Sequence, residues 1–424
     1  MRGLPGLTPS RDQQSPERGG GRERPIAFFI SQVEKPAAFA NLTRALAAGV
    51  VDVGGGPVDI LYLGKRGSSG TAKIPPGVRL VPLDASRSMR SIPSLIGYLR
   101  QNRPRALITM PALITLPALI AYRLSGRKVR RGSSFVIYQG DTLKSELYMD
   151  YKRTRRLLLM PTLAKILFPY ADAMIACAPG VIELLQRDGT PLPGGRAEVI
   201  PNPVDIELYA ERATAEPPAH PWLADKSGPV ITTLSTMGNR KNHPLLLRAL
   251  AEIRRNGCNS RLIFFGDGPA RERTEALASE LGLSEFVSFA GFVPNPHADI
   301  SRSDLFVISS DDEAFCLALV EAMACGVPVV STDAVGGGPK SILLGSPGEI
   351  NADDAQVLRS ALVPCGDSAA LANAIQRCIE EPAFGKALSE AGLRRVEAFA
   401  PRPIGARWVE YLHQLELERE ARSA

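Results

Sequence analysis

The sequence predicts an α/β protein made of two doubly wound, parallel-sheet domains. Short apolar runs with β-branched residues alternate along the chain with segments of good helix formers, which is typical of parallel sheets covered by helices. A complete βαβ unit is visible over residues 305–332. The length of 424 residues fits two domains of ordinary size.

The βαβ unit is the most informative stretch of the chain. Leu305–Ile308 is expected to be a buried strand, CLALVEAMAC a helix, and Pro328–Thr332 the next strand. Glu313 lies in the loop before the helix, and Glu321 lies in the helix, eight residues after Glu313. Both are expected near the edge where such sheets bind ligands. The alternative is a solvated helix start with one surface acid.

The composition is that of a globular protein. Hydrophobic residues make up 45% of the chain and charged residues 22%, which excludes wholesale disorder. Fifty Lys and Arg against 44 Asp and Glu give a mild net charge of +6, whose clustering matters more than its size. The six cysteines form no CxxC pair and predict buried thiols in a reducing compartment. The four scattered histidines indicate no zinc site.

Two segments bear on targeting. Residues 1–24 are rich in Pro, Gly and Arg and predict a disordered leader without the apolar region of a secretory signal. Ala106–Leu124 is the most apolar window, but Pro111 and Pro117 interrupt it. A strand followed by a buried helix is therefore preferred there over a membrane span, which needs about 20 apolar residues.

The first half of the chain predicts strands that alternate with helices. Expected strands are Pro25–Ile30, Val58–Leu63, Val78–Pro82, Ala106–Thr109, Ser134–Tyr138 and Tyr170–Ala176. Helices are expected at Ala38–Ala48 and near Ile92–Gln101. The segment Val199–Asp205 closes this half, and residues 206–228 are expected to be a Pro-rich, semi-rigid linker.

The second half repeats the alternation. Expected strands are Val230–Leu234, Arg261–Gly268 with its turn, Val287–Phe292 and Val363–Asp367, and expected helices include Ala270–Leu281, Lys340–Leu344 and Ala369–Glu380. Arg240 and Lys241 come just before a helix that starts near Pro244. Cations at a helix start favour an anion. The alternative is a surface Arg-Lys pair.

The stretch EAFCLALVEAMACGVPVVSTD resembles the signature of retaining glycosyltransferases of family 4, in which seven residues separate two glutamates. The resemblance extends from about Pro25 to Phe399 and implies the GT-B fold: two facing Rossmann-like domains with an interdomain cleft and a C-terminal helix that crosses back. It implies an N-terminal acceptor domain at 25–205, a linker at 206–228, a nucleotide-sugar domain at 229–398 and the returning helix at 399–424.

The resemblance also implies roles for individual residues. Glu313 contacts the donor sugar and Glu321 the ribose hydroxyls, while Lys241 with Arg240 stabilises the charge that grows on the diphosphate. Gly336–Pro339 is a candidate phosphate-facing nest. The remaining expected donor-binding residues are Ala314, Phe315, Cys316 and Leu317, through backbone N–H groups, and Phe292 and Val293, as the wall that holds the base.

The chain departs from the family pattern at four positions. Pro36 stands among alanines where the family carries paired glycines, and Gly140, next to Asp141, stands where it often has a histidine. Thr236 takes the place of an arginine and Ser341 that of a glutamate. At these positions the chain lacks the residues with which the family contacts the donor.

The function implied is transfer of a hexose from a nucleotide-diphosphate sugar, UDP favoured over GDP, to a glycan or lipid-linked acceptor in surface polysaccharide or glycolipid synthesis. No Asp-x-Asp motif closes a strand, so no metal and no cofactor besides the donor is expected. The expected location is cytoplasmic, and peripheral at the inner membrane face if the basic clusters 123–131 and 152–156 bind it; the alternative for each is a solvated helix face.

No nucleic acid partner is expected. The alternative from another class is a non-catalytic GT-B protein that binds nucleotide or glycan in a biosynthetic assembly, and the changed positions motivate it. A nucleotide-sugar epimerase of related fold is disfavoured by the two-glutamate signature.

Overall fold

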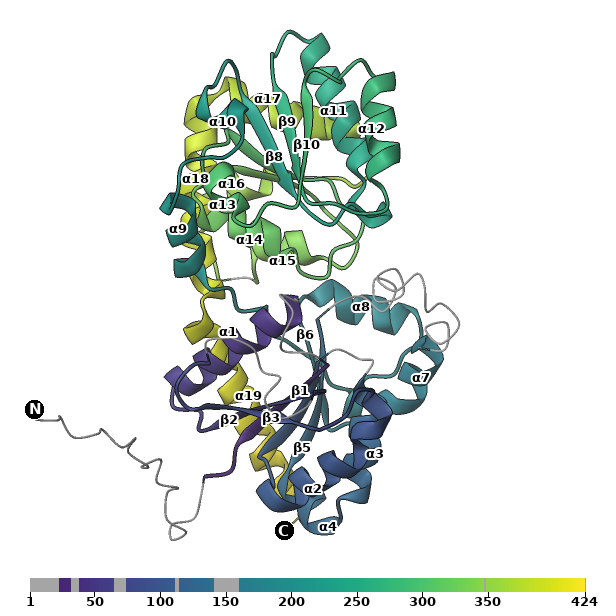
Figure 1. Ribbon diagram of the computed structural model, residues 1–424. Helices are drawn as coiled ribbons and strands as arrows, with labels where there is room; N and C mark the ends of the chain where they lie inside the picture. The colour runs from purple at the N-terminus through teal and green to yellow at the C-terminus, as the bar shows by residue number, and fades with distance from the viewer. Residues whose placement is uncertain are drawn as a thin grey trace, which may run out of the picture.

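Two parallel β-sheets, each covered by helices, form two α/β domains stacked end to end (Figure 1). This confirms the predicted fold class of two Rossmann-like domains. The computed structural model describes residues 23–31, 38–64, 74–110, 114–140, 160–346 and 348–423. The predictions for most of the leader, for Pro36, for Asp141 and for the basic cluster 152–156 lie outside these residues.

The first sheet has seven strands in the order β3-β2-β1-β4-β5-β6-β7, all paired in parallel. The strands are β1 (Ile26–Ile30), β2 (Val58–Tyr62), β3 (Val78–Pro82), β4 (Ala106–Met110), β5 (Ser134–Gln139), β6 (Ala173–Ala176) and β7 (Glu198–Val199). Every residue of β1, β2 and β4 is buried, as expected of parallel strands with helices on both faces.

The helices of the first domain include α1 (Ala38–Asp52), α2 (Ile92–Asn102), α3 (Thr115–Leu124), α4 (Arg127–Gly132), α7 (Met160–Leu167) and α8 (Pro179–Arg187). The apolar window at 106–124 is the strand β4 followed by the largely buried helix α3, as predicted. Across the described ranges, no helix combines the length and the apolar character needed to cross a membrane.

The second sheet has six parallel strands in the order β10-β9-β8-β11-β12-β13. They are β8 (Val230–Leu234), β9 (Arg261–Phe265), β10 (Val287–Gly291), β11 (Leu305–Ile308), β12 (Val329–Thr332) and β13 (Leu362–Val363). The last strand is shorter than predicted, because Asp367 instead caps the next helix by accepting the Ala370 N–H at 2.9 Å.

The helices around the second sheet are α11 (His243–Arg255), α12 (Arg271–Glu280), α13 (Pro296–Ile300), α14 (Leu317–Ala324), α15 (Gly338–Leu344), α16 (Ala352–Arg359), α17 (Ser368–Glu380) and α18 (Pro382–Val396). The order of the strands reverses between β8 and β11. Open α/β sheets bind ligands at such a reversal, beyond the carboxyl ends of the strands.

The stretch expected to be a Pro-rich linker contains two helices, α9 (Ile206–Thr214) and α10 (Pro221–Ala224). Asp205 caps α9 by accepting the Leu208 N–H at 3.1 Å. Helix α9 packs against α13 and α14 of the second domain. These helices were not predicted, because the prolines between them favoured an extended linker.

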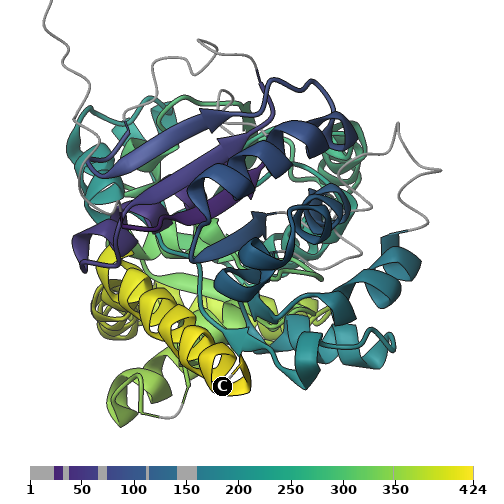
Figure 2. The same cartoon turned by 90° about the horizontal axis from the view of Figure 1, so that it is seen from below.

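The chain ends in the long helix α19 (Pro401–Ser423), which runs back along the first domain to its far end (Figures 1 and 2). Trp408 is fully buried, with its ring centroid 5.8 Å from those of Phe28 and Tyr138. Arg105 pairs with Glu416 through two bonds of 3.0 and 2.9 Å. The predicted return of the last helix to the first domain is confirmed.

Candidate active site

Two loops of the second domain meet where the strand order reverses. The β8–α11 loop carries Lys241 and the β11–α14 loop carries Glu313. The Asp311 N–H donates to the Arg240 carbonyl at 2.8 Å, and Ser309 Oγ donates to the Lys241 carbonyl at 2.9 Å. These bonds tie the two loops into one framework at the ligand-binding edge of the sheet.

The side chains of Lys241 and Glu313 form an ion pair across this framework, with Lys241 Nζ donating to Glu313 Oε1. Ser310 Oγ donates to the same carboxylate oxygen at 2.9 Å. The exposed fractions of the two side chains are 16% and 4%, so either charge alone would be costly to keep there. An ammonium group has three N–H donors, of which this pair uses one.

Local structure explains how Lys241 reaches the glutamate. Asn239–Lys241 form a 3₁₀ turn, and Asn242 follows in the left-handed conformation with φ of 42°. The Asn242 side chain accepts the Leu245 N–H at 3.3 Å and donates to Asp311 Oδ1 at 2.8 Å. One asparagine thus caps α11 and links it to the glutamate loop.

The glycine run Gly336–Gly338 supports the main chain at Glu313. The Glu313 N–H donates to the Val335 carbonyl at 2.8 Å, and the Gly338 N–H donates to the Glu313 carbonyl at 2.9 Å. A Cβ on Gly336 would lie 2.8 Å from that same carbonyl oxygen. In the expected phosphate-facing nest, the Gly338 N–H therefore already donates to Glu313, and the Gly337 N–H already donates to the Ala334 carbonyl.

The first domain touches this loop directly. Cys177, after β6, donates its thiol to the Ala314 carbonyl at 3.4 Å. A Cβ on Gly180 would lie 2.5 Å from the Gly336 oxygen. The corner between β6 and α8 thus rests on the glutamate loop, and Figure 1 shows α8 facing α15 across the junction of the domains.

Glu321, on α14, is held by two aromatic side chains. His297 Nε2 donates to Glu321 Oε2 at 3.0 Å, and the Tyr209 hydroxyl is hydrogen-bonded to the same side chain. The His297 and Tyr209 rings lie 4.6 Å apart. Burial, followed by the charge of Glu321, raises the pKa of Tyr209.

Neither aromatic partner of Glu321 was predicted from the sequence. Tyr209 lies in the stretch expected to be a linker, and His297 counted among scattered histidines. Pro296 at the first position of α13 was the signal available for that helix. Among the described residues, the Nδ1 atom of His297 is buried and has no hydrogen-bond partner.

Cys316 shows that the two acidic groups and the lysine share one electrostatic environment. Its thiol is buried at the start of α14. Burial is the main cause that raises the pKa of Cys316 to about 12; Glu313 and Glu321 add to the rise and Lys241 opposes it. Glu313, Lys241 and Glu321 therefore all lie within electrostatic reach of the start of one helix.

The other predicted site residues are placed as follows. Ala314, Phe315 and Cys316 are buried, and Arg240, Leu317 and Val293 are half-buried. Phe292 is 82% exposed just beyond β10 and takes part in none of the contacts above. The structure thus brings the loop residues together with Glu313 and leaves Phe292 projecting into solvent.

Three of the positions that depart from the family pattern lie in the described residues. Thr236 is exposed in the β8–α11 loop, and Gly140 is half-buried directly after β5. Ser341 lies in α15, where its carbonyl accepts Arg395 Nη2 at 3.2 Å. None of the three joins the Lys241–Glu313 pair.

Comparison with known proteins identifies the class. Residues 219–395 match the family model of glycosyl transferases group 1. The fold is similar to that of a sucrose-phosphate synthase from Thermosynechococcus elongatus (TM-score 0.70, 21% identity, 93% of this chain and 99% of that one) and of Anabaena HepE in complex with UDP and glucose (TM-score 0.68, 20% identity, 92% and 100%).

The curated relatives that the chain matches are also glycosyltransferases. The chain is 28% identical over 290 residues to an N-acetylgalactosaminyltransferase of Campylobacter jejuni that acts on a diphospho-undecaprenol-linked sugar, covering 68% of this chain and 71% of that one. It is 30% identical over 246 residues to a GDP-mannose-dependent phosphatidylinositol monomannoside mannosyltransferase of Mycolicibacterium smegmatis, covering 55% and 59%.

The fold, the family match and the relatives together define a glycosyltransferase of the GT-B class. More particularly, residues 219–395 are a glycosyltransferase group 1 domain.

Proposed function

We propose that this glycosyltransferase is a retaining, metal-independent member of family 4. It moves a hexose from a nucleotide-diphosphate sugar, UDP favoured over GDP, to a glycan or lipid-linked acceptor in surface polysaccharide or glycolipid synthesis. The observation that carries the proposal is the shielded Lys241–Glu313 pair at the reversal of the second sheet. The activities of the Campylobacter and Mycolicibacterium relatives, both on lipid-linked substrates, support the acceptor class.

The proposal divides the work between the two halves of the chain. Residues 25–205 bind the acceptor and residues 229–398 bind the nucleotide sugar. Residues 206–228 connect them, and the helix at 399–424 fastens the second half to the first. The two segments that pass between the halves are linked by hydrogen bonds, such as the one from the Val204 N–H to the Phe399 carbonyl at 2.8 Å.

Lys241 carries the leaving-group role in this proposal. The diphosphate gains negative charge as the glycosidic bond breaks, and a fixed cation lowers the free energy of that state. Lys241 is already held by Glu313, so little reorganisation is needed when a phosphate arrives. Arg240 adds a second cation in the same turn.

Glu313 and the loop after it hold the sugar. Its carboxylate lies against Lys241 and Ser310, where it stabilises positive charge at the anomeric carbon. Backbone N–H groups of residues 314–317 donate to sugar hydroxyls. Glu321, oriented by His297 and Tyr209, accepts from the ribose hydroxyls, and residues 292–293 hold the base.

A thermal-shift panel of nucleoside diphosphates is the first test, because it assigns the base before an acceptor is known. We expect UDP to raise the unfolding midpoint most, in line with the UDP-bound HepE structure; the GDP-mannose named for the mycobacterial relative makes GDP the competitor. Hydrolysis of the matching sugar nucleotide then tests turnover. Binding without turnover across donors and acceptors would support the non-catalytic alternative.

Metal independence and retention need separate measurements. Turnover should survive EDTA treatment unchanged, whereas loss of activity that Mg²⁺ or Mn²⁺ restores would refute metal independence. The anomeric configuration of the product, read by NMR against that of the donor, decides retention. An inverted product would remove Glu313 from the role given to it here.

Peripheral contact with the cytoplasmic face of a membrane is also part of the proposal. In the cluster 123–131, Arg123, Arg127, Lys128 and Arg131 are exposed. Basic surfaces of this kind bind anionic lipids and lose them at high salt. Salt-sensitive cosedimentation with phosphatidylglycerol vesicles, and none with phosphatidylcholine vesicles, is expected; equal behaviour with both would argue against the contact.

A further inference from the structure

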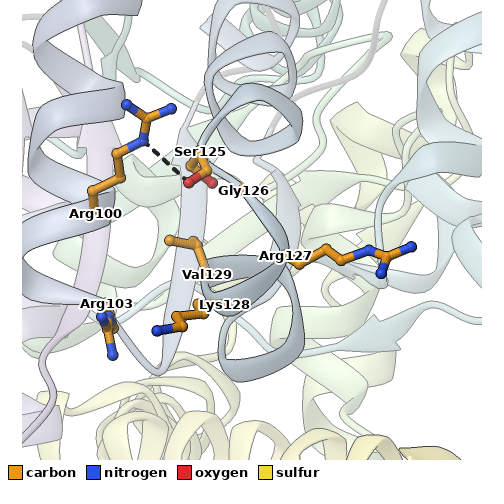
Figure 3. A pocket seen from close by; sticks show the side chains of 7 residues that line it. All are labelled: Arg100, Arg103, Ser125, Gly126, Arg127, Lys128 and Val129. Atoms are coloured by element: carbon orange, nitrogen blue, oxygen red, sulfur yellow. Dashed lines mark hydrogen bonds between the residues drawn. The ribbon is translucent and has the colours of Figure 1, made fainter.

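A second cationic site lies in the first domain, away from the Lys241–Glu313 pair. A cavity of about 290 Å³ opens between α2 and the α3–α4 corner. It is lined by Arg100, Arg103, Ser125, Gly126, Arg127, Lys128 and Val129 (Figure 3). Helices α2 and α4 lie at the end of the first domain that faces away from the second domain (Figure 1).

The chain around this cavity is free of acidic residues. Between Asp84 and Asp141 the sequence contains no Asp or Glu. Over the same residues it contains ten cations: Arg87, Arg90, Arg100, Arg103, Arg105, Arg123, Arg127, Lys128, Arg130 and Arg131. In a chain whose acids and bases are otherwise nearly balanced, this segment carries an excess of positive charge, of which Arg105 is paired with Glu416.

Two of the lining cations share one end of the pocket. In Figure 3, Arg103 and Lys128 lie at the same end, the Arg100 side chain extends towards Ser125, and the Arg127 guanidinium points away on the other side. Within the described parts of the chain, neither Arg103 nor Lys128 forms an ion pair with a carboxylate. Among those residues the two charges therefore have no carboxylate as a counterion.

Two of these cations stand on well-defined backbone. Arg100 donates through Nε to the Ser125 carbonyl at 3.2 Å and through Nη2 to the Leu124 carbonyl at 3.0 Å, which fixes its guanidinium over the corner. Arg103 ends α2 in the left-handed conformation, with φ of 43°. This conformation is common for a residue that ends a helix, and the Arg103 N–H donates to the Leu99 carbonyl at 3.0 Å.

We propose that this cavity binds a phosphate group, at a site separate from the donor site. Guanidinium groups match phosphate oxygens with paired N–H donors, and an ammonium adds a point charge. Neutral sugars would gain little from the charges of Arg103 and Lys128, which have no carboxylate partner among the described residues. The phosphate belongs either to a small soluble compound or to a lipid head group, and the experiment below separates these sources.

Inorganic phosphate is the first probe, titrated into the full chain at constant ionic strength with UDP at saturating concentration and followed by ³¹P NMR line width. Arg103→Gln/Lys128→Gln is expected to weaken phosphate binding about tenfold or more. Arg90→Gln, which removes the same kind of charge from the same acid-free segment but outside the cavity, is expected to change it less than twofold. Thermal unfolding midpoints check that the variants remain folded.

Vesicles of phosphatidylcholine with and without phosphatidic acid are the second probe. Cosedimentation with the phosphatidic acid vesicles that the double variant loses and Arg90→Gln keeps would assign a lipid head group. Phosphate binding without vesicle binding would assign a soluble ligand. Binding to neither probe, or an equal loss in Arg90→Gln, would overturn the site; neither result depends on whether UDP binds at Glu321.

Discussion

Lys241 and Glu313 lie 72 residues apart in the chain and form an ion pair that is largely shielded from solvent. The pair holds a cation where a leaving diphosphate would accumulate charge, and it holds a carboxylate where a sugar would gain positive charge. Neither residue can be removed without leaving the other charge in a poorly solvated place. Substitution of either Lys241 or Glu313 should therefore affect both turnover and stability.

Lys241→Ala is expected to lower turnover by roughly 10²-fold or more, because it removes stabilisation of the leaving group. It should also lower the unfolding midpoint, since the Glu313 carboxylate would lose its counterion. Lys340→Ala is the matched control: Lys340 is 58% exposed and 3.7 Å from Asp333. Unchanged turnover in Lys241→Ala would remove the lysine from the mechanism.

Glu321→Ala is expected to weaken nucleoside diphosphate affinity by about tenfold or more, because a carboxylate–diol contact is lost. Tyr209→Phe should weaken it less, since His297 still orients the carboxylate. Titration calorimetry with the diphosphate that shifts the midpoint most measures both. Equal affinity in the wild-type protein and Glu321→Ala would show that the ribose is held elsewhere.

Gly180→Ala tests the contact between the domains. The added Cβ would lie 2.5 Å from the Gly336 oxygen, a distance that main-chain atoms must relieve by moving. We expect a lower unfolding midpoint and a reduced turnover, because the displaced segment supports Glu313. In Gly97→Ala, within α2, the Cβ meets nothing within 4 Å, and the variant should be neutral or slightly stabilising. Identical behaviour of the two variants would contradict the close approach.

His243 predicts a pH dependence of stability. Burial, with smaller effects of Lys241 and Arg273, lowers the pKa of His243 from 6.5 to about 4. The unfolded chain therefore binds a proton near pH 6.5 while the folded chain stays neutral to about pH 4. The contribution of His243 to the free energy of unfolding is fully present above pH 6.5. It is lost as the pH falls from 6.5 to about 4, by about 3 kcal/mol in all.

The matched variant for this prediction is His243→Gln, which retains a polar partner for Ser235 Oγ, 2.8 Å from His243 Nε2. Denaturant unfolding of both proteins at pH 7 and pH 5 measures the effect. The wild-type protein should lose about 2 kcal/mol more than the variant on this change. Parallel losses would mean that His243 does not titrate differently in the two states.

Most elements were predictable because they depend on local patterns. The runs at β1 and β11 are apolar throughout, which suits strands covered on both faces, and the segment that forms α14 combines helix formers with a glycine stop. The charged residues Glu313 and Lys241 stand in loops that follow such strands. Their importance could be inferred from the order of strand, loop and helix.

The partners of those residues were not predictable in this way. Tyr209 reaches Glu321 because α9 packs on α13 and α14, and Gly180 meets Gly336 because the two domains touch. That Arg103 and Lys128 line one pocket likewise depends on how α2 packs beside the α3–α4 corner. By itself the sequence determined the strands, the helices and the chemical types at their ends. The tertiary structure alone decided which of these groups meet, because contacts between distant segments depend on packing and not on local propensity.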